Sequence, residues 1–338
     1  MRKIRIAQIG TSKYSHGNGI FPVLCKFNEI FEVVGYALPE NERTKFPKEV
    51  KIFEGYRELT VEEILSDETI EAVAIETEEI YLSKYALMAA NAGKHIHLEK
   101  PGATSLADFE AVIDAMRKSK KIFHIGYMYR YNPAIIEAIE RVRSGELGNI
   151  ISVEAQMDCY HNAPVRKWLS TFKGGMMFFL GCHLVDIIYS IQGEPDEVVA
   201  LNTCSKNGID EGEDHGFALF KYNNTYSFAK TSALKVGGFI SRQLVICGEK
   251  GTIEIKPIEQ YTDTERSAMI SKTRSISLEE ATASGWNASG EERITDEYLR
   301  YDNMMTSFAE FIRKERRNPY TLDYELGLYK LILKACNA

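Results

Sequence analysis

With 338 residues, the chain is longer than one hydrophobic core usually organises, which predicts two domains. Apolar residues make up 44% of it, as in globular proteins, and a formal net charge of -7 provides no attraction for nucleic acid or an anionic membrane. The six cysteines have no CxxC spacing, so we expect neither a metal site nor a disulfide framework. With no run apolar and long enough to be a signal core or a membrane span, we predict a cytoplasmic protein that binds a small molecule.

The amino-terminal residues follow the pattern that opens a dinucleotide-binding fold. Residues 3–9 indicate a buried strand that ends at Gly10, and a helical pattern follows. In such folds the helix amino terminus receives the pyrophosphate on free backbone N–H groups. The fingerprint GxGxxG is incomplete, because Ser12 and Ser15 stand where its second and third glycines are expected. From this stretch alone, a plain strand-to-helix turn is at least as good an interpretation.

A second strand is predicted at 31–37, and an acid that binds the adenosine ribose is expected at its end. Leu38 occupies that place, and Glu40 is the nearest candidate to reach the ribose. Strands and helices then alternate at the spacing of parallel crossovers, with strands predicted at 72–75, 95–98 and 122–126 and helices at 56–65, 81–92 and 107–118. Residues 1–125 are therefore predicted to form a Rossmann-type, doubly wound parallel sheet.

The run GKHIHLEKP, Gly93 to Pro101, is the central segment of the predicted first domain. Its strand delivers Glu99 and Lys100 at the carboxyl end, where open α/β sheets bind ligands, and we expect the pair to be exposed there. An ordinary surface ion pair is the alternative. Pro101 restricts Lys100 to extended backbone, which favours a lysine placed for function.

The second half, 126–338, is predicted to be an α+β domain with a large, mainly antiparallel sheet. Its alternating strands are expected at 151–157, 197–203, 216–222, 225–233, 243–247 and 251–255, and helices at 132–144, 174–191, 295–314 and 323–336. Residues 262–292 are polar and irregular, which predicts a long loop. A stripe of methionine and aromatic side chains on the helix at 295–314 is interpreted as core.

Three motifs, in order, carry a family resemblance: LEKP at 98–101, GYMYRYNP at 126–133 and GGMMFFLGCHLVD at 174–186. Together the motifs resemble the Gfo/Idh/MocA oxidoreductases, over essentially the whole chain. The resemblance implies an amino-terminal domain that binds NAD or NADP and a second domain whose open sheet often serves oligomerisation. It therefore implies a homodimer or homotetramer that oxidises or reduces a sugar, a polyol or a related carbinol.

The resemblance also implies roles for individual residues. Lys100 would contact the reacting hydroxyl, His183 would be the acid/base, and Asp186 would help to shape the substrate site. The cofactor-binding positions would be Gly10, Thr11, Ser12, Leu38, Thr77, Glu78, Glu99 and Lys100. These residue types suit hydride transfer, because histidine titrates near neutral pH and lysine stabilises negative charge on oxygen. The alternative for His183 is a helix histidine bonded to Asp186 or to backbone.

Polar and aromatic residues between the lysine and histidine motifs suit a sugar or polyol, and Tyr127, Arg130, Tyr160, Trp168, His161 and Arg166 are the candidates. Tyr160 and His161 could equally form a half-buried strand end. Phe179 stands where many members carry a substrate-binding aspartate, and it would favour a less polar ligand.

Four departures from the family pattern surround the predicted cofactor cleft: Ser12, Leu38, Phe179, and Thr77-Glu78-Glu79 in place of Thr-Pro-Asn. The extra carboxylates, Glu78 and Glu79, would oppose pyrophosphate binding. Loss of the acid that binds the ribose would remove a preference for NAD over NADP. A second hypothesis is therefore a catalytically silent member that acts as a ligand-binding or scaffold protein.

Overall fold

The computed structural model describes all residues except 1, 206–211 and 263–267. The chain forms two compact units, which are described separately: 1–128 with 301–329, and 129–300 with 330–338.

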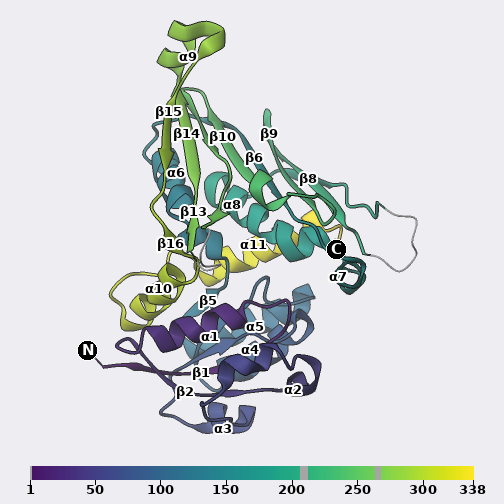
Figure 1. Cartoon of the computed structure of the whole chain (residues 1–338), viewed down its shortest axis with the longest axis vertical. Coiled ribbons are helices and arrows are strands. Elements are labelled where there is room, and N and C mark those ends of the chain that lie inside the picture. The colour runs from purple at the N-terminus through teal and green to yellow at the C-terminus, as the bar shows by residue number, and fades with distance from the viewer. Residues whose placement is uncertain (1, 206–211, 263–267) are drawn as a thin grey trace. The chain divides into compact units, whose positions relative to one another are not determined.

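The first unit is built on a five-stranded parallel sheet in the order β2-β1-β3-β4-β5 (Figure 1). Its strands are β1 (Ile4–Ile9), β2 (Phe31–Ala37), β3 (Ala72–Ile75), β4 (His95–Leu98) and β5 (Phe123–Ile125). Its helices include α1 (Gly17–Lys26), α2 (Glu42–Lys45), α3 (Val61–Ser66), α4 (Leu82–Asn91) and α5 (Leu106–Ser119). The strand order reverses between β1 and β3, which creates the crevice where doubly wound sheets bind ligands. The predicted Rossmann-type sheet is confirmed.

The first unit also contains α10 (Asp302–Arg313) and the first part of α11 (Leu322–Ala335). The sequence assigned this segment to the second domain. The structure places it in the first because the predicted stripe is core there. Met304, Met305, Phe308 and Phe311 are buried, and the ring of Phe308 stacks on His124 of β5 at 5.2 Å.

The second unit is built on an eight-stranded sheet in the order β15-β14-β11-β10-β6-β9-β8-β7. Its strands are β6 (Ile150–Asp158), β7 (Glu197–Ala200), β8 (His215–Tyr222), β9 (Thr225–Ser232), β10 (Gln243–Gly248), β11 (Gly251–Ile255), β14 (Lys272–Ser277) and β15 (Glu291–Ile294). Among these strands only β6 and β9 pair in parallel, so the mainly antiparallel prediction is confirmed. Helices α6 (Pro133–Arg143) and α8 (Cys182–Gln192) pack on the sheet, and α7 (Ala163–Leu169) precedes α8.

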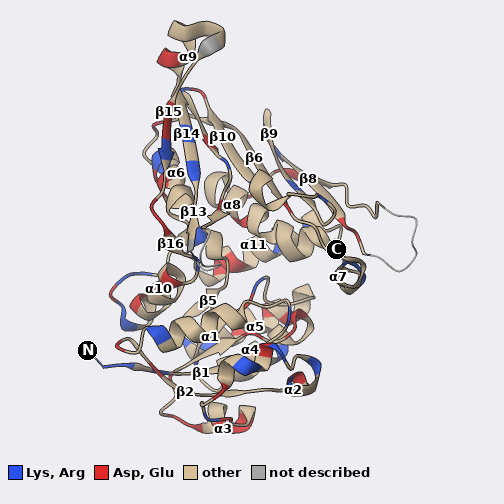
Figure 2. Ribbon diagram, in the orientation of Figure 1, with Lys and Arg blue, Asp and Glu red and all other residues tan. Residues whose placement is uncertain are grey.

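The loop predicted at 262–292 is wrong for the part that the structure describes. This stretch contains β13 (Ala268–Ile270), β14, α9 (Leu278–Ser284) and the start of β15, and α9 lies at the far end of the β14–β15 pair (Figure 1). The ribbon carries basic residues on β14 and acidic residues on β15 (Figure 2), the two strands pair, and Lys272 forms an ion pair with Glu292. Polar pairs hold these exposed strands together, so the apolar alternation that signals a strand is missing.

A three-stranded sheet of β12 (Gln260–Tyr261), β13 and β16 (Tyr298–Leu299) completes the unit. Because β16 takes up Tyr298–Leu299, α10 begins at Asp302 and not at the predicted residue 295. No helix in the described part of the chain combines the length and apolarity that crossing a membrane requires.

Candidate active site

Three parallel strands of the first unit bring the candidate residues to one edge of the sheet. Gly10 follows β1, Glu76 and Thr77 follow β3, and Glu99 and Lys100 follow β4. Because β1 and β3 flank the point where the strand order reverses, these residues surround the crevice of the fold.

The Glu99–Lys100 pair is buried, and the predicted exposure is wrong. Glu99 is 1% and Lys100 2% exposed, and Lys100 Nζ lies 3.7 Å from Glu99 Oε1. Burial by itself raises the pKa of Glu99, but the neighbouring His16 and Lys100 outweigh it and lower that pKa to about 2. Glu99 is therefore a carboxylate at neutral pH, beside a buried lysine.

Carboxyls after β3 adjoin this pair, and they change the expected electrostatics. Burial raises the pKa of Glu79 to about 8, and burial with repulsion from Glu99 raises the pKa of Glu76 well above its usual value. Glu78, the other predicted repulsive carboxylate, forms an ion pair of 2.7 Å with Lys45. At neutral pH Glu79 is mostly protonated and Glu78 is paired, so the two extra carboxylates oppose a pyrophosphate less than the sequence suggested. Sequence reasoning missed Glu76, although its place directly after a buried strand was visible.

The loop after β1 keeps one glycine of the GxGxxG fingerprint, Gly10, and its backbone requires that residue. Gly10 has a φ of +83°, and a Cβ there would lie 2.3 Å from the Thr77 methyl group. Ser12 Oγ accepts hydrogen bonds from the backbone N–H groups of Tyr14 (3.1 Å) and Ser15 (2.9 Å). The serine that replaces a glycine therefore satisfies N–H groups that a pyrophosphate would otherwise use.

Glu42 is a second residue that sequence reasoning missed. It lies on the short helix α2, is buried, and its Oε2 accepts a hydrogen bond of 3.1 Å from the Thr11 N–H group. Glu40, the predicted ribose candidate, instead binds Lys84 Nζ at 2.5 Å and Tyr85 Oη at 2.6 Å. Thus the carboxyl beside the glycine loop comes from the helix after Leu38. An acid at the start of that helix was the available indication.

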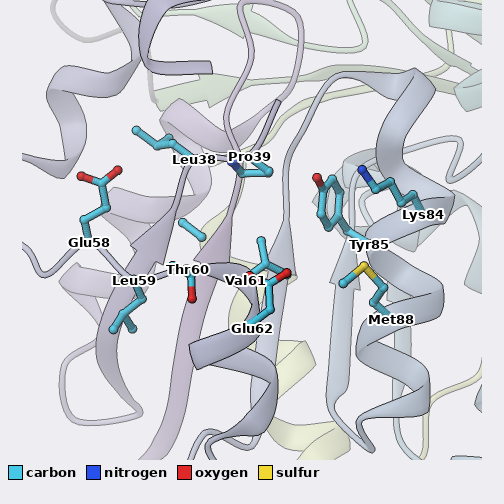
Figure 3. A pocket seen from close by; sticks show the side chains of 11 residues that line it. Leu38, Pro39, Glu58, Leu59, Thr60, Val61, Glu62, Lys84, Tyr85 and Met88 are labelled. Carbon is cyan, nitrogen blue, oxygen red and sulfur yellow. The ribbon is translucent and has the colours of Figure 1, made fainter. Parts of the chain in front are cut away.

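A pocket of about 360 Å³ lies at the carboxyl end of β2 (Figure 3). Leu38 and Pro39 line one side, the segment 58–62 lines another, and Tyr85 and Met88 of α4 contribute aromatic and thioether surface. Its volume is within the range of small-molecule sites, and its lining combines apolar and polar groups as such sites do.

The buried carboxyl of Glu42 makes the stability of the first unit depend on pH. Burial raises its pKa to about 9, so the folded state keeps a proton that the unfolded state releases near pH 4.5. The stabilisation is complete below about pH 4.5 and is lost as the pH rises through 9. We expect Glu42→Gln to make the free energy of unfolding fall less steeply between pH 6 and 8, by about 1 kcal/mol per pH unit.

Urea unfolding of the full chain at several pH values measures this slope. Glu63→Gln is the matched control, because Glu63 is exposed in the α3 capping box and its hydrogen bonds with Thr60 lower its pKa. It stays ionised throughout this window. An unchanged slope in Glu42→Gln would contradict the assignment of a buried, protonated Glu42.

In the second unit, Gly175 and a π-helical turn precede the helix that carries His183. Gly175 has a φ of +42°, and a Cβ there would lie 2.3 Å from the Glu213 carbonyl oxygen. The turn η4 (Met177–Gly181) leads directly into α8, and such turns recur at functional sites. His183, the second residue of α8, is 1% exposed.

Tyr129 packs edge-on against His183, with ring centroids 5.0 Å apart, and it is a third residue that sequence reasoning missed. Its Oη donates a hydrogen bond of 2.5 Å to Glu259 and accepts one of 2.8 Å from Arg242. Burial raises the pKa of Tyr129, so its phenol stays neutral. Its position in the GYMYRYNP motif was the available indication.

Arg130 and Asp186, both predicted at the substrate site, bind each other. The guanidinium Nε and Nη2 atoms lie 2.8–3.0 Å from the carboxylate oxygens, and both side chains are buried. This bidentate pair holds α8 at Asp186, one helical turn after His183, and so orients the face of the helix that carries the histidine.

The remaining predicted substrate residues are divided between the units. Phe179 is half-buried and packs at 5.0 Å, edge to face, on Trp168 of α7. Tyr160 is 62% exposed and forms an isolated bridge with Leu234, so it is more exposed than the half-buried strand end of the alternative. Tyr127 belongs to the first unit and is buried there. Arg166 is buried and donates a hydrogen bond of 2.7 Å to the His161 carbonyl oxygen, so it braces the backbone.

Comparison with known proteins gives two family models that match the chain, one in each unit. Residues 4–127 match the model of the oxidoreductase family's NAD-binding Rossmann fold, and residues 135–254 match the GFO/IDH/MocA C-terminal domain. The chain belongs to the Gfo/Idh/MocA oxidoreductase family. The resemblance carried by the three sequence motifs is confirmed.

Relatives within this family share part of their length with the chain. An uncharacterised oxidoreductase of Escherichia coli is 29% identical over 202 residues, 59% of this chain and 57% of that protein. An inositol 2-dehydrogenase of Salmonella typhimurium is 31% identical over 158 residues, 46% of this chain and 44% of that protein. These matches span less than two thirds of each relative's length.

Solved structures share the fold over nearly the whole chain. The aldose-aldose oxidoreductase of Caulobacter crescentus, complexed with glycerol, has a TM-score of 0.76 at 22% identity and covers 99% of this chain and 98% of its own. A 3-ketoreductase from Actinomadura kijaniata, in complex with TDP-benzene and NADP, has a TM-score of 0.76 at 16% identity, with 98% and 96% covered.

The first unit of this Gfo/Idh/MocA member fits the nicotinamide dinucleotide that its domain family implies. Gly10 lets the loop after β1 run so close to Thr77 that a Cβ would clash, and the pocket at β2 has the size of a small-molecule site. Glu42 Oε1 is buried and has no hydrogen-bond partner among the described residues, so a bound hydroxyl group could satisfy it. Among the described residues, no group of three or more His, Cys, Asp or Glu side chains could hold a metal ion.

Proposed function

We propose that the chain is an NAD(P)-dependent oxidoreductase that transfers a hydride between a nicotinamide and a carbinol of a sugar, polyol or related small molecule. The observation that carries the proposal is the buried Glu99–Lys100 pair at the crevice of an NAD-binding Rossmann domain. An ammonium group held in a dry site stabilises developing charge on oxygen far more strongly than one in water. The names of an inositol dehydrogenase and an aldose oxidoreductase among its relatives support the substrate class.

In this proposal the cofactor lies along the carboxyl edge of the first sheet. Gly10, Thr11 and Thr77 would hold the pyrophosphate region, the pocket beside Leu38 the adenosine, and Glu42 its ribose. When bound, the nicotinamide supplies the carbon that accepts or donates the hydride. A carboxyl beside the ribose favours a free diol over a 2′-phosphate, so we expect NAD to bind more tightly than NADP.

The chain's own residues would handle the proton and the substrate. Lys100 would hold the reacting oxygen through its ammonium group. His183, oriented by the Tyr129 ring and by α8, would take the hydroxyl proton on oxidation and return it on reduction. Trp168 and Phe179 would offer an aromatic surface to the apolar face of a sugar-like ring. A homodimer or homotetramer stays a prediction.

The second candidate is a catalytically silent member, and one observation favours it. The N–H groups of Thr11 and His16 donate to the carboxyls of Glu42 and Glu99, and Ser12 satisfies two more N–H groups of the same loop. A pyrophosphate must compete with these internal acceptors.

Calorimetric titration of the full chain with NADH and NADPH, after absorbance has checked for nucleotide already bound, separates the candidates. Saturable binding, tighter for NADH, is the result we expect, and it would justify a screen of sugars and polyols. Tighter binding of NADPH would overturn the role of Glu42 while keeping the oxidoreductase. Binding of neither would favour the silent member.

A further inference from the structure

A buried histidine–carboxylate–lysine series links the surface of the first unit to Lys100. We propose that His16 is a positioning residue that, through Glu99, keeps Lys100 in its ammonium form. The catalytic consequence rests on the proposed function above. The charge state of Lys100 is a property of the protein itself and can be measured without turnover.

The geometry of His16 fits this role. It directly precedes α1, and both its backbone N–H (3.0 Å) and its ring Nδ1 (2.8 Å) approach the same oxygen, Oε2 of Glu99. A carboxylate only accepts hydrogen bonds, so the ring must carry a proton on Nδ1. The other oxygen, Oε1, lies toward Lys100 Nζ at 3.7 Å. Two donors on one oxygen therefore fix the carboxylate with its second oxygen toward the lysine.

Burial makes the charges of this series depend on one another. Glu99 and Lys100 are almost fully buried, and a buried ammonium loses its proton unless a nearby anion stabilises it. Glu99 is that anion only while it stays ionised. The side chain of His16 is 18% exposed, so it is the member of the series in contact with solvent.

Apart from Lys100, the other titratable groups around Glu99 carry no charge at neutral pH. Glu76 and Glu79, which follow β3, are buried acids whose raised pKa values favour the neutral form. His97 Nε2 lies 3.4 Å from Glu76 Oε1, and its Nδ1 lies 2.8 Å from Nδ1 of His124. Burial lowers the pKa of His97 to about 4, so at neutral pH it carries no charge. Among the described groups that face Glu99, His16 and Lys100 therefore supply the opposite charge or ring donor that favours its ionised form, and the neutral Glu76 carboxyl adds a hydrogen bond.

The test measures the titration of Lys100 in the cofactor-free full chain by side-chain ¹⁵N NMR. The Lys100 signal is identified by its loss in Lys100→Arg. We expect the measured Lys100 titration in His16→Phe, which keeps a ring but removes the ring donor, to move to lower pH than in the wild-type protein. We expect His16→Gln, which can keep a side-chain donor, to move it less. His95→Gln is the matched control, because His95 lies at the other end of β4 and should leave the titration unchanged.

The outcomes separate this inference from the proposed function. A wild-type Lys100 titration in a folded His16→Phe protein would overturn the inference, whatever the enzyme's activity. If that variant does not fold, an unchanged titration in His16→Gln overturns it instead. Where a carbinol substrate is turned over, we also expect the alkaline limb of the kcat/KM profile to move to lower pH by the same amount. Absence of turnover would count against the proposed function alone.

Discussion

Replacement of Lys100 by methionine is expected to lower turnover of a carbinol substrate by about 10²–10³-fold, because one preorganised donor to a developing oxyanion contributes that much. Methionine keeps the length and apolar contacts of the buried side chain. The cofactor affinity should change less than the turnover, since the glycine loop and the β2 pocket, which would hold the pyrophosphate and the adenosine, lie on other segments. Steady-state kinetics, combined with calorimetric titration of NADH, separates the two quantities.

Lys94→Met is the matched control for this variant. Lys94 is also a buried lysine next to β4, but its Nζ donates to the carbonyl oxygens of Asp67 and Ile70 at the other end of the strand. We expect it to reduce stability without reducing the turnover of the folded fraction. Full turnover in Lys100→Met would contradict the role assigned to Lys100.

Asp186→Asn is expected to reduce the free energy of unfolding of the second unit by about 3–5 kcal/mol, because it leaves the Arg130 guanidinium buried without a counter-charge. Both side chains of this pair are nearly inaccessible to solvent, so water cannot compensate the loss. Urea unfolding of the full chain, followed by tryptophan fluorescence, measures the change. The two tryptophans, Trp168 and Trp286, both lie in the second unit.

The double variant Arg130→Met/Asp186→Leu tests whether the loss comes from the unpaired charge. It removes both charges with similar volume and should recover most of the stability. Glu197→Gln is the control, because its ion pair with Lys221 lies in the same unit, is exposed and should contribute less than about 1 kcal/mol. A stable Asp186→Asn protein that no longer binds substrate would show that Asp186 acts on the ligand and not mainly on Arg130.

The sequence by itself determined the frame of the site. The bounds of β2, β3 and β4 follow from short apolar runs, and the place of Gly10 follows from the apolar run that it ends, which are local properties of the chain. These runs were sufficient to predict a Rossmann-type sheet and to place Lys100 at its carboxyl edge. The motifs further predicted a helical His183 in a second, mainly antiparallel domain.

Only the tertiary structure decided the environment of those residues. His16 meets Glu99 from a position 83 residues earlier in the sequence, and Glu42 reaches Thr11 across a separation of 31 residues. Burial, and with it the charge of Glu99 and Glu79, depends on which distant segments cover a side chain. No local pattern records such contacts. For the same physical reason the sequence of β14 and β15 predicted a loop, since the ion pair that joins these strands exists only once they are side by side.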